Sequence, residues 1–184
     1  MKKLLALVLS LMMLLGVCAL AEQVGEGFEE HFVTLQGEEY EIPATVCMPT
    51  SEGKHPAVVM LHGTGSTRDE AGDGYKHAAP VLAAKYGIAT IRIDFPGNGE
   101  STADYMQYTF DTAVADAVCA AQYMMSLDAI DPELIGVMGW SQGGTDALLA
   151  CGRHPEIFKS IVTWAGAPDM MLDGFFSQED YDEA

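Results

Sequence analysis

The residue of this sequence best suited to covalent chemistry is Ser141, which lies between Gly139 and Gly143 in a Gly-x-Ser-x-Gly pattern. The pattern follows an apolar stretch that predicts a strand, Leu134–Met138, and precedes a segment with helical spacing. A serine on such a turn is exposed at the sheet edge, and larger residues than glycine would collide with the strand and helix. The first N–H of the helix, on Gln142, can donate to an oxyanion. We therefore predict Ser141 as a nucleophile; the alternative is a bystander serine in an ordinary turn.

A second glycine-rich segment, His62-Gly63-Thr64-Gly65-Ser66, directly follows the apolar stretch Ala57–Leu61. Acyl transfer needs two N–H donors for the oxyanion, each lowering the barrier by about 3 kcal/mol. The spacing favours the N–H of Thr64 as the second donor, with Gly63 as the neighbouring possibility. His62 precedes the turn, and we expect it to hold the loop by a hydrogen bond rather than to act as a base.

A third glycine-rich segment, Asp94–Ser101, follows the strand predicted over Ile88–Ile93. Its glycines allow a tight excursion of the backbone after the strand. Asp94 could be the acid of a catalytic triad, but a buried carboxylate that caps loop amides is the interpretation the pattern favours.

No histidine is well placed to act as the base for Ser141. His154 lies at the far end of the helix that follows the serine, and such a helix is roughly 18 Å long, whereas proton transfer needs a contact of about 3 Å. Asp169, after the last predicted strand, is a candidate acid, although an aspartate there can equally cap a turn. Three other histidines precede the serine and have no reason to converge on it, namely His31, His55 and His77.

The elements that must position these residues alternate along the chain. From residue 57 the order is strand, helix, strand, helix, strand, helix, strand, and the strands are apolar on both faces, which predicts a mostly parallel α/β sheet covered by helices on both sides. A turn is expected at Asp131-Pro132, and Gly87 suits a helix C-terminus. Strands are expected over His31–Leu35, Thr45–Met48, Ala57–Leu61, Ile88–Ile93, Leu134–Met138 and Ser160–Trp164, and helices over Tyr75–Tyr86, Thr109–Leu127 and Thr145–Gly152.

Residues 1–21 have the layout of a secretory signal peptide. Lys2 and Lys3 precede an apolar run from Leu4 to Val17, and a small-x-small cleavage pattern ends at Ala21. The run is too short for a comfortable membrane span. We therefore expect cleavage after this pattern and a secreted or extracytoplasmic protein.

The rest of the chain, residues 22–184, is expected to be one domain with an acidic surface. The full sequence carries a formal net charge of −18, which disfavours nucleic acid and anionic membrane surfaces as partners. For residues 1–21, the alternatives to signal cleavage are lipidation at Cys18 and an uncleaved membrane anchor. The other cysteines have neither CxxC nor metal-ligand spacing, so no metal or cofactor is expected; they are Cys47, Cys119 and Cys151.

Three motifs in this order resemble those of the α/β-hydrolase superfamily: HGTGS at 62–66, DFPGNGES at 94–101 and GWSQGG at 139–144. Within it, the stretch from Arg92 to Ser101 resembles bacterial feruloyl- or cinnamoyl-esterases and dienelactone-hydrolase-like esterases. The resemblance covers about Phe32 to Trp164. It implies an α/β-hydrolase fold and hydrolysis of a small carboxylic ester through an acyl-serine intermediate. It also implies that the residue-141 hydroxyl is the nucleophile and that the amides of residues 64 and 142 form the oxyanion hole.

The resemblance further implies a triad in the order serine, acid, histidine, with the last two after later strands. The sequence stops at Ala184, just after a helix-starting pattern at Ser177–Asp180, so we expect the N-terminal part of a longer hydrolase. Ser160–Trp164 would then be an apolar edge strand, and this chain alone would be inactive. Two alternatives stay open: a serine peptidase of the same fold, or an inert fragment or binding module.

Overall fold

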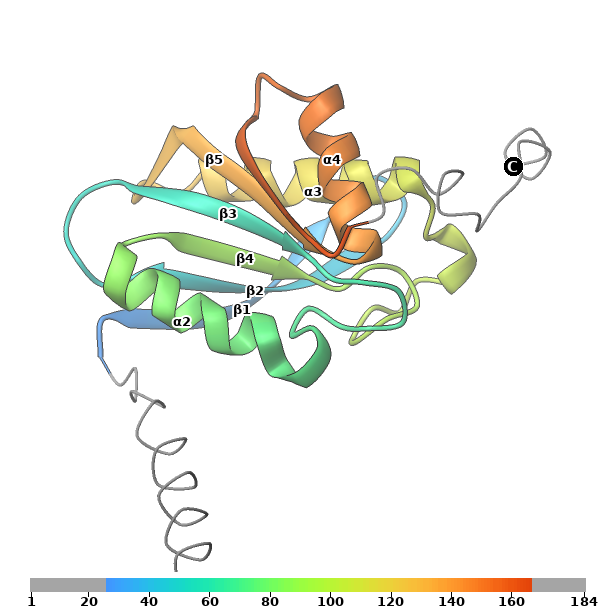
Figure 1. Cartoon of the computed structure of the whole chain (residues 1–184), viewed down its shortest axis with the longest axis horizontal. Helices are drawn as coiled ribbons and strands as arrows, with labels where there is room; N and C mark the ends of the chain where they lie inside the picture. Colours follow the sequence, from blue (N-terminus) through green and yellow to red (C-terminus); the bar gives the residue numbers. More distant parts are fainter. Residues whose placement is uncertain (1–25, 167–184) are drawn as a thin grey trace, which may run out of the picture.

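The structure, a computed structural model, describes residues 26–166; the expectations about residues 1–21, Asp169 and Ser177–Asp180 lie outside the described residues. Within this range the strands form a single sheet between layers of helix (Figure 1). The strands are β1 (Phe28–Gln36), β2 (Glu41–Pro49), β3 (His55–Leu61), β4 (Ala89–Ile93), β5 (Ile130–Trp140) and β6 (Phe158–Trp164). The helices are α2 (Gly74–Tyr86), α3 (Phe110–Met125) and α4 (Gln142–Arg153), with short 3-10 turns η1 (Ala71–Asp73) and η2 (Tyr105–Gln107).

The sheet has the order β1-β2-β4-β3-β5-β6. Strand β3 pairs in parallel with β4 and β5, and β5 pairs in parallel with β6. The β1–β2 hairpin joins β4 in antiparallel fashion. The carboxyl ends of β3, β4 and β5 therefore lie at one edge, so the loops that follow them meet there. This mostly parallel α/β arrangement confirms the predicted fold class.

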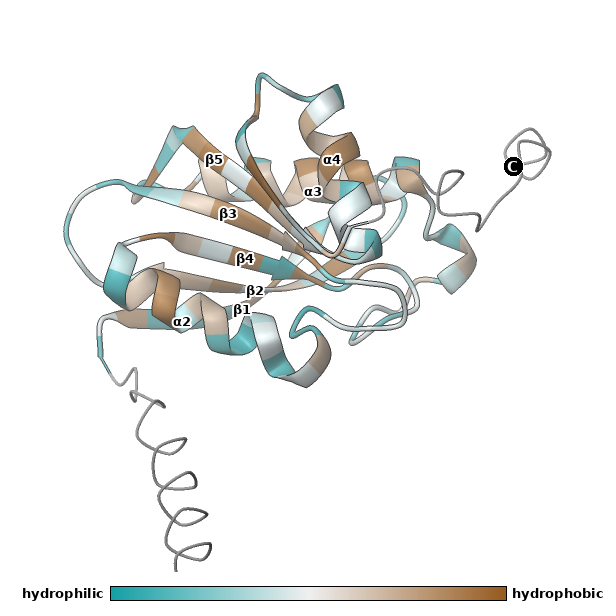
Figure 2. Ribbon diagram, viewed as in Figure 1, coloured by the Kyte–Doolittle hydropathy of each residue, from teal (hydrophilic) through white to brown (hydrophobic). Residues whose placement is uncertain are grey.

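Helices cover both faces of the sheet, as the two-sided apolar strands predicted. Helix α2 packs on β4 and β2, whereas α3 and α4 contact each other and the strands β3 and β5. All five residues of β4 are buried, and Figure 2 shows brown along the central strands and the hydrophilic colour mostly in loops and helices, apart from a teal segment at the carboxyl end of β4. Gly87 ends α2 with a φ of 65°, as expected for a C-terminal glycine.

One sequence prediction about the sheet is wrong. Asp131 and Pro132 do not form a turn but lie inside β5. His55 pairs with Ile130 and Ala57 pairs with Ile135, so the register shifts and the extra residues of β5 bulge from the ladder. Because a bulge residue does not need its N–H for pairing, it can be a proline.

Strand β6 forms one edge of the described sheet, as predicted. It pairs with β5 on one side, and its apolar side chains after the buried Phe158 are open to solvent: Val162 is 56% exposed and Trp164 is 55% exposed. Within residues 26–166, none of the helices combines the length and apolar content that a membrane span requires.

Candidate active site

Ser141 lies between the end of β5 and the start of α4 in a backbone conformation that L-residues rarely adopt. Its φ is 51° and its ψ is −121°, which costs on the order of 1–3 kcal/mol unless neighbouring contacts fix it. Its N–H donates to the Trp164 carbonyl at 2.9 Å, and its carbonyl accepts from the Gly144 N–H at 2.9 Å. The serine is thus held between the edge strand β6 and the first turn of α4.

The two glycines that flank the serine are required by close backbone packing. A Cβ on Gly139 would lie 1.8 Å from the Gly143 carbonyl oxygen, and one on Gly143 would lie 2.2 Å from the Leu61 carbonyl oxygen. The first close approach lies between the end of β5 and the first turn of α4. The second lies between α4 and the end of β3. The elbow is therefore fixed to the strand from which the second motif begins.

The segment after β3 lies directly against Ser141. A Cβ on Gly63 would be 3.1 Å from the Ser141 Cβ, so glycine lets the backbone approach this closely without displacing its neighbours. The Thr64 hydroxyl donates to the Gln142 side-chain carbonyl, which ties the two candidate oxyanion residues together. Within residues 26–166 the N–H groups of Thr64 and Gln142 have no hydrogen-bond acceptor. The Gly63 N–H, by contrast, donates to the Glu70 carboxylate at 2.7 Å, so of the two loop candidates Thr64 alone keeps a free donor.

His62 is fully buried and braces this segment. Its Nδ1 lies 2.8 Å from the Gly63 carbonyl oxygen, which can only accept, so Nδ1 carries the proton; Nε2 accepts the Phe95 N–H at 3.1 Å. Burial lowers the pKa of His62, so the ring stays neutral. Both nitrogens are occupied by backbone groups, and the ring joins the loop after β3 to the loop after β4.

Asp94 caps loop amides, which confirms the interpretation favoured from the sequence. Its side chain is 1% exposed and accepts the N–H groups of Arg68 at 2.7 Å and Glu100 at 3.0 Å. It also pairs with the Arg68 guanidinium. A Cβ on Gly99 would lie 2.2 Å from the Asp94 carboxylate, so that glycine makes room for the acid.

A second buried acid, which the sequence pattern did not reveal, connects helix α4 to the loop before α3. Asp146 on α4 is fully buried and accepts the Tyr108 hydroxyl at 2.9 Å. Burial raises the pKa of Asp146 to about 7. Tyr108 stacks on Phe95 with ring centroids 4.6 Å apart, and Phe95 in turn lies against His62. These contacts link α4 to the loop after β3.

The structure does not bring a histidine to Ser141. His154 follows the last turn of α4 and lies 3.1 Å from the Glu156 carboxylate. His55 is at the start of β3, bonded to the carbonyls of Ser51 and Gly87. The remaining two, His31 on β1 and His77 on α2, are exposed.

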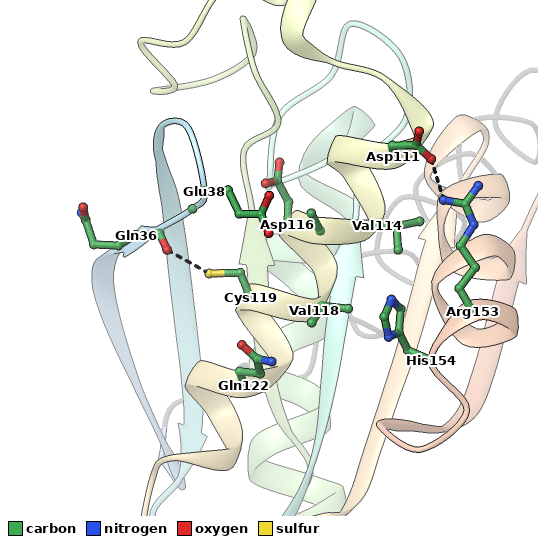
Figure 3. A pocket seen from close by; sticks show the side chains of 12 residues that line it. Gln36, Glu38, Asp111, Val114, Asp116, Val118, Cys119, Gln122, Arg153 and His154 are labelled. Carbon is green, nitrogen blue, oxygen red and sulfur yellow. Dashed lines mark hydrogen bonds and ion pairs between the residues drawn. The ribbon is translucent and has the colours of Figure 1, made fainter.

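A cavity on another part of the surface is separate from this serine site. It has a volume of about 480 Å³ and runs along α3 between the β1–β2 turn and the end of α4 (Figure 3). Its lining includes Asp116, Cys119 and His154 but none of the residues around the elbow. Asp116 accepts the Tyr40 hydroxyl at 3.0 Å, and Arg153 pairs with Asp111 across the rim.

A strand-to-helix elbow that carries a serine, at the carboxyl edge of a mostly parallel sheet, defines an α/β-hydrolase with a serine-hydrolase-like site. The chain belongs to the prolyl oligopeptidase family, whose family model matches residues 74–184.

Known proteins of this class have matching sequences and structures. A 2,6-dihydropseudooxynicotine hydrolase from Paenarthrobacter nicotinovorans is 33% identical over 148 residues, which are 77% of this chain and 36% of the relative. A pimeloyl-[acyl-carrier protein] methyl ester esterase from Aeromonas hydrophila is 31% identical over 120 residues, 65% of this chain and 41% of the relative. Est1E from Butyrivibrio proteoclasticus, solved with ferulic acid, shares the fold with a TM-score of 0.62 and 24% identity, over 70% of this chain and 50% of that one. The chain thus spans well under half the length of these two curated relatives.

Proposed function

We propose that the complete protein is an exported serine hydrolase that cleaves carboxylic esters of small molecules through an acyl-Ser141 intermediate. The observation that carries this proposal is the juxtaposition of the strained Ser141 with the loop after β3. Gly63 packs on the serine, and the Thr64 side chain is bonded to that of Gln142, so two residues whose backbone N–H groups have no acceptor within residues 26–166 are held next to Ser141. That is the arrangement that stabilises a tetrahedral oxyanion.

In the proposed reaction the Ser141 Oγ forms a bond to the ester carbonyl carbon while its proton passes to a base. The carbonyl oxygen becomes an oxyanion that accepts from the Thr64 and Gln142 N–H groups. The carbon–oxygen bond to the alcohol breaks, and the base gives its proton to the leaving alkoxide. Water, deprotonated by the same base, then attacks the acyl carbon; the bond from that carbon to Oγ breaks, the base returns its proton to Oγ, and the acid leaves. We infer that the base and its acid come from outside residues 26–166, where Asp169 stays a candidate acid.

Ester cleavage is favoured over peptide cleavage by what two of the similar proteins are known to act on or bind. One relative is named as a methyl ester esterase, and the solved neighbour holds ferulic acid. The family match is the specific observation in favour of a serine peptidase, because its name is that of an oligopeptidase family. Export is supported by the basic start, apolar run and cleavage pattern of residues 1–21.

The test compares the complete protein with its Ser141→Ala variant on p-nitrophenyl acetate and on a proline-containing peptide anilide. We expect ester turnover that the variant loses, with little anilide cleavage. Faster anilide than ester hydrolysis would establish the peptidase instead. Ester turnover that survives in Ser141→Ala would refute the acyl-serine mechanism.

A further experiment addresses the chain by itself. We expect residues 22–184 alone to show negligible turnover of the same ester, because no described histidine reaches Ser141 and a serine without a base is a weak nucleophile. Robust hydrolysis that disappears in Ser141→Ala would show that the base lies within these residues. If neither this chain nor the complete protein hydrolyses the ester, the better interpretation is that the protein is an inert fragment or a binding module.

A further inference from the structure

Glu70 is a buried, strained residue for which the proposed reaction has no direct use. It is 8% exposed and has a φ of 61° and a ψ of 172°, a region that residues other than glycine avoid. Its two carboxylate oxygens serve different backbone groups: Oε2 accepts the Gly63 N–H at 2.7 Å, and Oε1 accepts the Ala71 N–H at 2.8 Å. The carboxylate of the strained Glu70 therefore holds the loop beside Ser141 through the Gly63 N–H.

Gly63 has no side chain that would restrict its backbone angles, so hydrogen bonds from other residues must hold its conformation. A side chain at this position would press on Ser141 and Trp140, which favours glycine here, and glycine has the widest choice of backbone angles. Both of its backbone groups are fixed from outside. Its N–H is held by Glu70, and its carbonyl accepts from His62 Nδ1 at 2.8 Å and from the Ser66 N–H at 3.2 Å.

These anchors set the direction of the N–H that the reaction would use. The Gly63 carbonyl and the Thr64 N–H belong to one planar trans peptide, so they point in opposite directions. Fixing the planes on both sides of the Gly63 Cα fixes both of its dihedral angles. The Thr64 N–H is then aimed before substrate arrives, which is the preorganisation that oxyanion stabilisation depends on.

We propose that Glu70 is a positioning residue of this hydrolase: it clamps Gly63 opposite His62 and so aims the Thr64 N–H at the oxyanion. This inference rests on the proposed function. Charge alone predicts the opposite effect, because a carboxylate near a developing oxyanion repels it. A glutamine would remove that repulsion, but it offers one acceptor and one N–H₂ group where two backbone N–H groups point, so one of the two contacts would fail.

The kinetic test uses the complete protein with Glu70→Ala, Glu70→Gln and the control Thr109→Ala. Thr109 caps α3, its side chain bonds only within the first turn of that helix in the described part of the chain, and its loss should lower stability without touching the loop. We expect both Glu70 variants to lower kcat for p-nitrophenyl acetate roughly 10- to 100-fold with KM within about twofold, and to weaken inhibition by a trifluoromethyl ketone in parallel. The Thr109 variant should melt lower and keep its kcat. Equal kcat in the Glu70 and Thr109 variants, or a faster Glu70→Gln enzyme, would overturn the proposal.

A readout independent of turnover separates this proposal from the proposed function. In protein labelled with ¹⁵N-glycine, the Gly63 amide proton should resonate downfield, because it is bonded to a carboxylate, and should move upfield in Glu70→Ala but not in Thr109→Ala. If the wild type shows no Ser141-dependent turnover, the proposed function fails, and this resonance alone decides the clamp. A Gly63 resonance unchanged by Glu70→Ala would overturn the clamp whatever the activity.

Discussion

At the residue scale, the described site is built from backbone groups that glycines allow to approach one another. Gly63 illustrates this, because its absent Cβ would lie 3.1 Å from the Ser141 Cβ and 3.2 Å from the Trp140 carbonyl oxygen. Contacts that short force the backbone to shift by a few tenths of an ångström. Since misplacement of about 1 Å can cost a hundredfold in rate, small changes here should affect chemistry more than folding.

We therefore predict that Gly63→Ala lowers kcat of the complete protein by tenfold or more while the protein still folds. The measurement is steady-state ester hydrolysis together with a thermal melt. Gly152→Ala is the matched control, because a Cβ there meets nothing within 4 Å; near the end of α4 it should leave kcat unchanged and stabilise slightly. Unchanged kcat in Gly63→Ala would show that the loop is not part of the reacting centre.

A second residue-scale prediction concerns the buried ion pair. Asp94→Asn should destabilise the protein by about 3–5 kcal/mol, because the Arg68 guanidinium is left with less compensation in a buried position. Glu100 pairs with the same arginine, but its side chain is 71% exposed, so Glu100→Gln should cost no more than about 1 kcal/mol. Urea unfolding of both variants makes the comparison, and equal losses would contradict the assignment of Asp94 as the buried anchor.

At the element scale, sequence reasoning succeeded where a pattern is local and failed where partners are distant. The buried strands β3 and β4 were predictable because runs such as Val58-Val59-Met60 are apolar on both faces, and the elbow because its glycines are close in sequence. The bulge of β5 was not predictable, because it depends on how β5 pairs with β3. Glu70 lies seven residues from Gly63, but nothing in an acidic loop signals that its carboxylate turns inward, and Tyr108 lies 38 residues from Asp146.

The contact between α4 and the loop before α3 predicts a pH effect on stability. The Asp146 pKa is about 7 in the fold because of burial and about 4 in the unfolded chain. A raised folded pKa means that protonation favours the fold, so this contribution is complete below pH 4 and is lost as the pH rises through 7; its upper limit is about 4 kcal/mol. Asp146→Asn should abolish it.

The measurement is the free energy of unfolding of the complete protein in urea at pH 5 and pH 8. Between these values the wild type should lose more stability than Asp146→Asn, which still offers an acceptor to the Tyr108 hydroxyl. Any constant cost of the amide cancels in this difference. Glu133→Gln, on the exposed part of β5, is the control and should follow the wild type. Equal pH dependence in Asp146→Asn and wild type would show that the acid is not held protonated.

At the scale of the whole molecule, the described sheet is closed by packing on its two faces but open along β6. Val162 and Trp164 expose more than half of their surface on this strand, and an exposed apolar edge strand is a template for pairing between chains. Residues 22–184 carry 7 basic and 27 acidic residues, a net charge of −20; this charge opposes association at long range, but it does not cover the unpaired backbone groups. The two effects make opposite predictions for residues 22–184 studied alone.

We expect the edge strand to dominate, so that residues 22–184 alone are poorly soluble and lack a sharp cooperative melt. Val162→Lys places a charge on the open edge and should raise the soluble fraction, as charged side chains on edge strands do in natural sheets. Met106→Lys is the matched control, because Met106 is 82% exposed but lies in η2, away from β6. Light scattering and calorimetry of the three chains test this. If the two lysines act equally, surface apolarity rather than the strand edge drives association, and a sharp melt of the unaltered chain would show that β6 needs no cover.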